Sequence, residues 1–151
     1  MGMEHAVNFM VCNPARSVKG DYVEYTVIGI DKVGNFDVLR RYSDFVALRK
    51  ALTDRYVGLY IPPIPAKKAI GNTTESFVNE RCFLLNLFIR QLARCPYLVE
   101  SEEFEIFVRP SQENLQMQLT LLPNLSPENM LTRIQDYFSF IGNISERQMT
   151  E

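Results

Sequence analysis

The sequence predicts an α+β fold in which a three-stranded antiparallel sheet (a meander) packs against a helical layer. Three segments rich in Val, Ile, Tyr and Phe come first, and turn-prone residues separate them. After these segments the apolar residues recur with helical instead of strand spacing. A chain of 151 residues, 46% of them hydrophobic, is long enough to fill one compact core. This order of elements predicts a small sheet covered by helices.

The three predicted strands are residues 6–12, 21–30 and 35–42. The links "NPARSVKGD" and "DKVGN" join them, and such short links connect neighbouring antiparallel strands. Strict alternation along the third strand would place Arg41 and Tyr42 on opposite faces of the sheet. We therefore expect the strand to end or twist between these two residues.

The first predicted helix follows the third strand directly. Ser43 is its expected N-cap, and Phe45, Leu48, Leu52 and Tyr56 have the spacing of one buried helix face. The helix must end before "YIPPIPAKK", because its three prolines cannot continue a helix.

The second predicted helix begins near Asn72, which has capping-box spacing with Glu75, and it ends before Pro96. Arg81 lies on its apolar face, where a guanidinium is poorly tolerated unless it is paired or reaches a polar opening. Two interpretations stay open: Arg81 reaches solvent or the nearby chain, or it lines a pocket whose ligand carries oxygens. The expected inward stripe is Phe77, Arg81, Leu84, Leu85, Phe88 and Leu92.

Two further helices are predicted towards the C-terminus. Residues 101–109 form a short one with Ser101 as N-cap. Residues 125–143 form an amphipathic one, with Ser126 as cap, Pro127 in its first position and Gly142 after its end. This C-terminal helix either folds back on the core or begins a further helical region. Its expected packing stripe is Met130, Ile134, Tyr137, Phe138 and Ile141.

Composition and motifs argue against several classes of protein. The three cysteines are odd in number and lack CxxC spacing, which disfavours a disulfide framework or zinc site and favours a reducing cytosolic setting. The longest apolar run, "FLLNLFI", is far shorter than the ~20 residues of a membrane span. The only histidine, His5, offers no evident base for Cys82 or Ser43, and no P-loop or GxGxxG motif occurs. We therefore expect a protein that is not an enzyme and that needs no metal and no cofactor.

The net charge of −2 conceals a basic central segment. Residues 40–94 contain ten Lys or Arg against four Asp or Glu, whereas the rest of the chain is acidic. The basic segment predicts an anionic partner, and the acidic remainder argues against a nucleic-acid binder.

Three motifs occur in order within this basic segment. They are Arg-Arg-Tyr-x-Asp-Phe at 40–45, Pro-Pro-x-Pro-x-Lys at 62–67, and Glu-Arg at 80–81 in an amphipathic helix. Together with the order of strands and helices, they closely resemble the phox-homology (PX) domain, a family typified by the sorting nexins. The resemblance covers residues 7–110, and we expect residues 111–151 to form a helical C-terminal extension.

The resemblance implies a phosphoinositide-binding module that recruits a sorting-nexin-like trafficking protein from the cytoplasm to the early endosome membrane. In the family pattern Arg41 holds the 3-phosphate and Tyr42 packs against the inositol ring. Lys67 meets the 1-phosphate near the bilayer, and Arg81 bonds the 4- and 5-hydroxyls. A guanidinium suits phosphate, and an aromatic ring suits a sugar face. We expect a preference for phosphatidylinositol 3-phosphate, because further phosphates would clash with Arg81.

Neighbouring residues have secondary roles in this interpretation. Lys68 and Ile70 are expected to add accessory contacts with the membrane. Ser43 is a candidate regulatory phosphosite, because a phosphate there would repel the lipid headgroup. Arg40 is expected to be a solvated charge at the sheet edge.

A second hypothesis is a PX-like protein-interaction scaffold with weak or no lipid binding. The four filled lipid-binding positions argue against it, whereas the acidic remainder and the C-terminal helix favour an additional protein partner. In the family context this helix would either extend the PX core or begin a dimerisation region such as the BAR domain of many sorting nexins.

Overall fold

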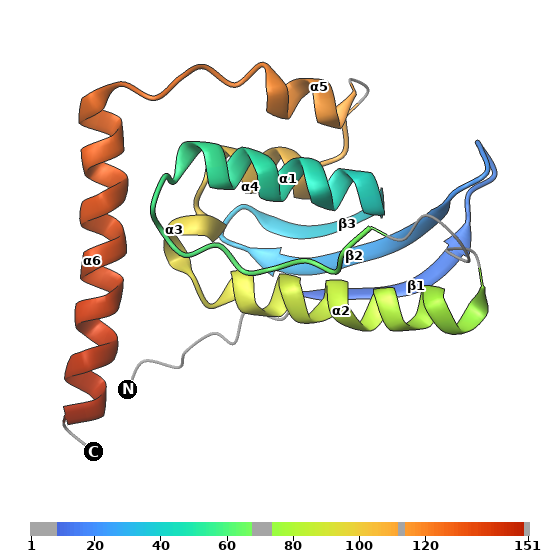
Figure 1. Cartoon of the computed structure of the whole chain (residues 1–151), viewed down its shortest axis with the longest axis horizontal. Coiled ribbons are helices and arrows are strands. Elements are labelled where there is room, and N and C mark those ends of the chain that lie inside the picture. The colour runs from blue at the N-terminus through green and yellow to red at the C-terminus, as the bar shows by residue number, and fades with distance from the viewer. Residues whose placement is uncertain (1–8, 68–73, 112–113, 150–151) are drawn as a thin grey trace.

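The computed structural model describes residues 9–67, 74–111 and 114–149, and it contains the predicted α+β architecture (Figure 1). The sheet has the order β1-β2-β3 with antiparallel pairing throughout, so the predicted meander is confirmed. The strands are β1 (Met10–Arg16), β2 (Val23–Asp31) and β3 (Gly34–Arg41). The helices are α1 (Tyr42–Arg55), α2 (Glu75–Ala93), α3 (Pro96–Val99), α4 (Glu102–Val108), α5 (Leu115–Thr120) and α6 (Pro127–Met149).

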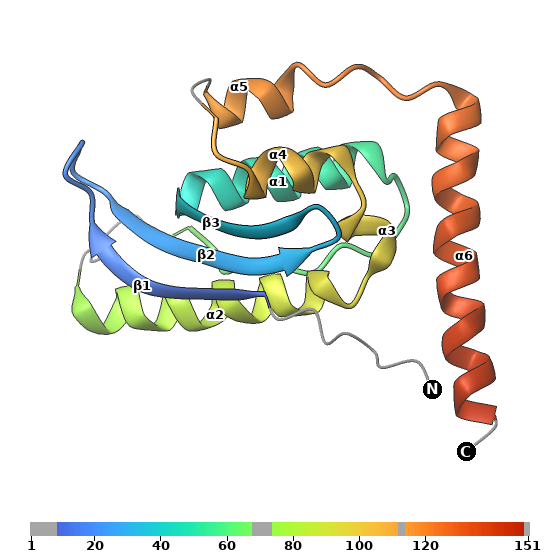
Figure 2. The same ribbon diagram turned by 180° about the vertical axis from the view of Figure 1, so that it is seen from behind.

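The curved sheet encloses the core together with the first four helices. Helix α2 runs along β1, whereas α1 and α4 lie beside β3, as both views of the chain show (Figures 1 and 2). Alternate residues of β2 and β3 face inward, which is the usual pattern of an antiparallel sheet with one covered face. The inward residues Val27 and Val38 are direct cross-strand partners, and both are buried.

Strand β1 differs from the expected segment. The prediction ended the strand at residue 12, but the strand continues through Asn13 and Pro14 to Arg16. Its register with β2 shifts between Cys12 and Ala15, and Asn13 has a φ of 51°. The residues that suggested a turn therefore form a β-bulge, which an edge strand accommodates.

Helix α1 begins one residue after β3 ends, so Ser43 is not its N-cap as predicted. The N-cap is Arg41, whose backbone N–H donates to the Asp44 carboxylate at 2.9 Å. Because no loop separates strand from helix, the last strand residue takes the capping position. The predicted end is confirmed, since the helix stops at Arg55, before the prolines.

The bounds of the second and fourth helices agree closely with the prediction. Helix α2 begins at Glu75 with Thr74 as N-cap, while the expected cap Asn72 lies outside the described residues. Ser101 caps α4 as predicted, with its Oγ accepting from the Phe104 N–H at 3.1 Å. The sequence did not reveal α3, which is a single turn.

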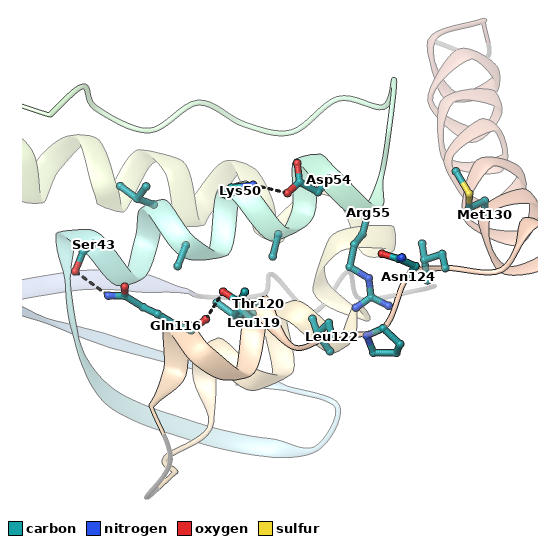
Figure 3. A pocket seen from close by; sticks show the side chains of 15 residues that line it. Ser43, Lys50, Asp54, Arg55, Gln116, Leu119, Thr120, Leu122, Asn124 and Met130 are labelled. Carbon is teal, nitrogen blue, oxygen red and sulfur yellow. Dashed lines mark hydrogen bonds and ion pairs between the residues drawn. The ribbon is translucent and has the colours of Figure 1, made fainter.

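The short helix α5 was also not predicted, and it packs on α1 and α4. Asn114 caps it by accepting from the Met117 N–H at 3.1 Å. Gln116 of α5 reaches Ser43 at the start of α1 (Figure 3). The segment after residue 110 therefore begins by covering the preceding domain, and the division at residues 110 and 111 stays a prediction.

Helix α6 is longer than predicted and packs through a different face. Ser126 is its cap as expected, but the helix continues through Gly142 to Met149. A glycine inside a helix costs about 1 kcal/mol without having to end it. Of the predicted packing stripe only Tyr137 is partly buried against the core; Met130, Ile134, Phe138 and Ile141 are exposed.

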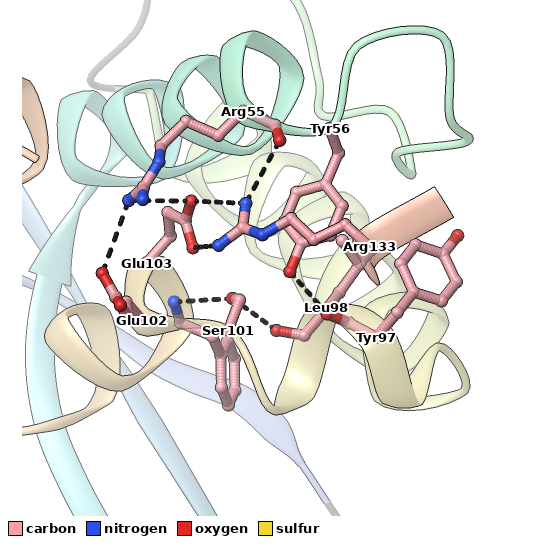
Figure 4. Close-up of polar contacts among 9 residues, drawn as sticks. Arg55, Tyr56, Tyr97, Leu98, Ser101, Glu102, Glu103 and Arg133 are labelled. Atoms are coloured by element: carbon pink, nitrogen blue, oxygen red, sulfur yellow. Dashed lines mark hydrogen bonds and ion pairs between the residues drawn. The ribbon is translucent and has the colours of Figure 1, made fainter. Parts of the chain in front are cut away.

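The contact between α6 and the core is made through α3, α4 and the C-terminal end of α1. The rings of Tyr137 and Phe140 lie 5.3 and 5.6 Å from that of Tyr97. Arg133 donates to the fully buried Glu103 at 3.1 and 3.3 Å (Figure 4). Arg55 approaches the same carboxylate at 3.2 Å. Helix α6 thus folds back on the core, which was one of the two possibilities that the sequence left open for this helix.

Within the described ranges, no helix is both long enough and apolar enough to span a bilayer.

Candidate functional site

Arg81 occupies an unusual position in the middle of α2. Its side chain is almost buried, with 7% of the residue exposed, and its Cζ lies 3.8 Å from the ring centroid of Tyr42. The ring of Phe77, one turn earlier, lies 4.4 Å away. Nε and Nη2 are buried and have no hydrogen-bond partner among the described residues. Arg81 therefore does not reach solvent, although it does bond the nearby chain through the Tyr25 side chain. Its two unpartnered nitrogens favour the pocket interpretation.

Tyr42 connects the start of α1 to the proline loop, residues 61–67. Its hydroxyl donates to the Pro65 carbonyl at 2.5 Å while its ring lies against Arg81. Arg49, about two turns further along α1, donates from Nε to the Pro62 carbonyl at 3.0 Å. These two bonds fix the loop against α1 and place the exposed Lys67 just beyond Pro65.

Arg41 lies next to Tyr42 at the junction of β3 and α1. The expected end of the strand between these two residues is confirmed, so the alternation of a strand does not separate them. The Arg41 guanidinium is exposed and lies over the ring of Tyr22, with Cζ 4.8 Å from the centroid. Its Nε donates to the Ser43 Oγ at 2.7 Å. The Arg41 side chain is therefore contacted by the Tyr22 ring and the Ser43 hydroxyl, and its Nη1 and Nη2 have no hydrogen-bond partner among the described residues.

Arg40 is not the solvated edge charge that was predicted. It alternates with Val38 towards the covered face, and its Nε and Nη2 donate to the carbonyls of Phe107 and Arg109 at 2.8 and 3.0 Å. Burial lowers the pKa of Arg40, and the negative charge of Asp44 acts in the opposite direction. Arg40 joins β3 to the end of α4 and supports the strand from which Arg41 projects.

The site carries uncompensated positive charge. Within the described residues, no ion pair involves Arg41, Lys67 or Arg81. Burial raises the pKa of Tyr25, which lies on the core side of Arg81, and the charge of Arg81 acts against this rise. A group of cations whose side chains form no ion pair with a carboxylate suits an anion, and it offers nothing to a metal ion. No cluster of metal-ligating side chains occurs in the part of the chain that the structure describes.

The four predicted lipid-binding residues are thus arranged around Tyr42. Tyr42 contacts Arg81 directly, adjoins Arg41 in the chain and holds the loop that carries Lys67. The predicted membrane contacts Lys68 and Ile70 lie outside the described residues.

Two aromatic residues of this site were not predicted to have a role in it. Phe77 was expected only as part of the inward stripe, although its i, i+4 spacing to Arg81 would have indicated a contact. Tyr22 lies just before β2, whose Glu24 pairs with Arg41. Only the register of the sheet places this ring beside Arg41, so the motif alone could not reveal it.

A separate groove of about 600 Å³ lies between α1, α5 and the segment that leads to α6 (Figure 3). Val46, Ala47 and Leu119 contribute to its apolar lining, and Ser43 lies at its edge. Of the predicted site residues only Ser43 lines it, so this groove is distinct from the group around Tyr42.

Comparisons with known proteins place sorting nexins among the relatives of this chain. The chain is 35% identical over 101 residues to sorting nexin 1 of Arabidopsis thaliana, covering 62% of this chain and 25% of that protein. It is 29% identical over 145 residues to sorting nexin-4 of Schizosaccharomyces pombe, covering 87% and 36%. The chain thus spans only about a quarter to a third of the length of these relatives.

A solved structure and a family model identify the fold. The X-ray structure of a designed CISK-PX domain matches with a TM-score of 0.61 and 27% identity, over 68% of this chain and 99% of that one. The PX domain family model matches residues 29–111, more than half of the chain, and this match includes the cationic group around Tyr42. The chain therefore belongs to the PX domain family, with sorting nexins among its relatives.

Proposed function

We propose that this chain binds phosphatidylinositol 3-phosphate and recruits a sorting-nexin-like protein to the early endosome membrane. The observation that carries the proposal is Arg81, buried between two aromatic rings with two nitrogens that lack acceptors within the described chain. Buried guanidinium nitrogens without acceptors are costly unless a ligand supplies the acceptors. Inositol hydroxyls are suitable acceptors, because they carry oxygen without adding a charge.

Each remaining residue has a matching role. Arg41 presents an exposed guanidinium for charge-assisted bonds to the 3-phosphate. Tyr42 lies between Arg41 and Arg81 in a position to pack against the inositol ring. Lys67 follows the anchored Pro65 and would serve as a point charge for the 1-phosphate. Lys68 and Ile70 stay predicted accessory contacts with the bilayer.

Selectivity would come from the immobility of Arg81. Its guanidinium is 3.8 Å from one ring and 4.4 Å from another, so it cannot move aside without losing both contacts. A phosphate on the 4- or 5-position needs more room than a hydroxyl, and it would displace this packed group. The arrangement therefore favours an inositol ring phosphorylated at the 3-position alone.

Sedimentation with liposomes that each contain one phosphoinositide tests this proposal. The wild type should bind phosphatidylinositol 3-phosphate selectively, and Arg41→Ala should lose the binding. Arg90→Ala is the matched control, because it removes the same charge from an exposed position in the last turn of α2. A folded wild type that sediments with no phosphoinositide would contradict the proposal.

The exposed apolar face of α6 supports a second candidate function, which is protein contact through this helix. Phe138 and Leu131 are 63% and 55% exposed, and Met130, Ile134 and Ile141 accompany them. Such a face is typical of a helix that meets a partner or a second copy of its own chain.

Sedimentation equilibrium of the wild type and Phe138→Glu tests self-association. A concentration-dependent dimer that the substitution abolishes supports it, and a wild type that stays monomeric argues against it.

A further inference from the structure

The side chain of Gln116, from outside the predicted lipid-binding set, completes a closed hydrogen-bond network at Arg41. Gln116 lies on α5, and its Nε2 donates to the Ser43 Oγ at 2.9 Å (Figure 3). The same Nε2 donates to the Asp44 Oδ1 at 3.2 Å. These two bonds use both N–H groups of the amide. α5 thereby bonds the first turn of α1, more than seventy residues earlier in the chain.

The two hydrogen bonds that hold Arg41 are accepted by Ser43 and Asp44, the same two side chains that accept from Gln116. The Arg41 Nε donates to the Ser43 Oγ at 2.7 Å, and its backbone N–H donates to the Asp44 Oδ2 at 2.9 Å. The Ser43 oxygen then accepts from Arg41 and Gln116 together, which fills its two acceptor positions. The Asp44 carboxylate accepts from Arg41 through Oδ2 and from Gln116 through Oδ1.

We infer that Gln116 is a positioning residue that holds the phosphate-binding arginine in its binding orientation through Ser43 and Asp44. This inference rests on the proposed function. An exposed arginine loses rotamer freedom when a ligand fixes it, and prior fixation reduces that entropic cost. The network uses Nε and leaves Nη1 and Nη2, which have no acceptor within the described residues, for a phosphate. Without Gln116 the Ser43 hydroxyl can rotate away, and Arg41 loses its anchor.

Titration of inositol 1,3-bisphosphate into the full chain measures the effect without a membrane. Gln116→Met keeps the length and packing of the side chain and removes only its donors, so affinity should fall about threefold to tenfold. Gln116→Glu replaces a donor with a carboxylate beside Asp44, so it should weaken binding further. Gln118→Met is the matched control, because Gln118 lies on the same helix and bonds Ser111 instead.

The ¹H–¹⁵N NMR signal of the Arg41 Nε–H group distinguishes positioning from a general structural role. This signal, assigned by its absence in Arg41→Lys, should shift or broaden in ligand-free Gln116→Met and stay unchanged in Gln118→Met. If Gln116→Met does not fold, Ser43→Ala removes the Arg41 acceptor directly and should give the same result.

Wild-type affinity in Gln116→Met would overturn the inference, and so would weaker binding with an unchanged Arg41 signal. A wild type that does not bind the bisphosphate would instead contradict the proposed function. In that case the Arg41 signal of the free protein still decides whether Gln116 holds Arg41.

Discussion

At the scale of single residues, the burial of Arg81 lowers the stability of the fold. Burying two guanidinium nitrogens, Nε and Nη2, without acceptors is unfavourable, and packing between Tyr42 and Phe77 recovers only part of that cost. A residue retained at such a cost is typically functional. The same reasoning separates Arg81 from Arg40, whose donors reach carbonyl oxygens of the protein itself.

Arg81→Met should leave the protein as stable as the wild type or more stable by about 1 kcal/mol, because an apolar chain of similar length fits between the rings. Headgroup binding should fall at least about tenfold, since charge-assisted bonds are lost. Chemical denaturation and calorimetric titration measure the two effects. A loss of several kcal/mol in unfolding free energy would indicate a structural role instead.

Ser43→Glu should weaken binding of phosphatidylinositol 3-phosphate about tenfold, because its charge lies beside the phosphate position and it removes the Arg41 acceptor. Part of this effect is electrostatic and should diminish at high salt. Liposome sedimentation at two salt concentrations measures both. Gln135→Glu, which adds the same charge to exposed α6, should bind like the wild type. Unimpaired binding by Ser43→Glu would exclude an off-switch at this residue.

The candidate site could be predicted where its residues are close in sequence or share one helix face. Arg41 and Tyr42 lie in one motif, and Arg81 is conspicuous on an apolar helix face. The role of Arg40 could not be predicted from the motif, since its carbonyl partners lie 67 and 69 residues away. Gln116 escapes prediction for the same reason, because it reaches Ser43 across 73 residues.

At the scale of elements, the β3–α1 junction sets the geometry of the site. The strand runs into the helix without a loop, so the capping position falls on Arg41. Sequence patterns predicted the strands and the long helices, because their apolar periodicity is local. They did not predict the bulge in β1 or the short helices α3 and α5. Those features depend on edge pairing and on packing against distant elements.

The sheet also depends on one close approach at Gly29. A Cβ atom there would lie 2.5 Å from the Phe36 ring and 2.6 Å from the Phe9 ring, and both rings belong to the core. Gly29→Ala should therefore reduce the free energy of unfolding by about 1–3 kcal/mol. Gly142→Ala should have the opposite effect, because Gly142 lies within α6 and a Cβ atom there would meet open space. This substitution should raise the free energy of unfolding by about 0.5–1 kcal/mol. Thermal denaturation of the two variants measures both changes in stability. Equal changes of the same sign would contradict the close approach at Gly29.

At the scale of the whole molecule, the C-terminal elements are part of the folded unit. Helix α5 covers α1, and α6 packs through Arg133 and two rings while leaving an apolar face exposed. Glu103 is the centre of this contact, because it is fully buried and lies within ion-pair distance of both Arg55 and Arg133 (Figure 4). Arg133 also lies 4.0 Å above the Tyr56 ring.

Glu103→Ala should cost about 3–5 kcal/mol of unfolding free energy, because it leaves two nearly buried cations without their shared partner. Arg133→Ala should reduce the free energy of unfolding by less, about 1–2 kcal/mol, since Glu103 still forms an ion pair with Arg55. Denaturant titration gives both values. The reverse order would show that the contact of α6 depends on Arg133 more than on the buried carboxylate.

We propose that Arg41, Tyr42, Lys67 and Arg81 together bind one 3-phosphorylated inositol headgroup. NMR chemical-shift mapping with inositol 1,3-bisphosphate should show this without a membrane. The largest shifts should fall on these four residues, and the Arg81 Nε–H signal should move as its nitrogen gains an acceptor. Shifts confined to the groove between α1 and α5, or no shifts in a folded protein, would contradict it.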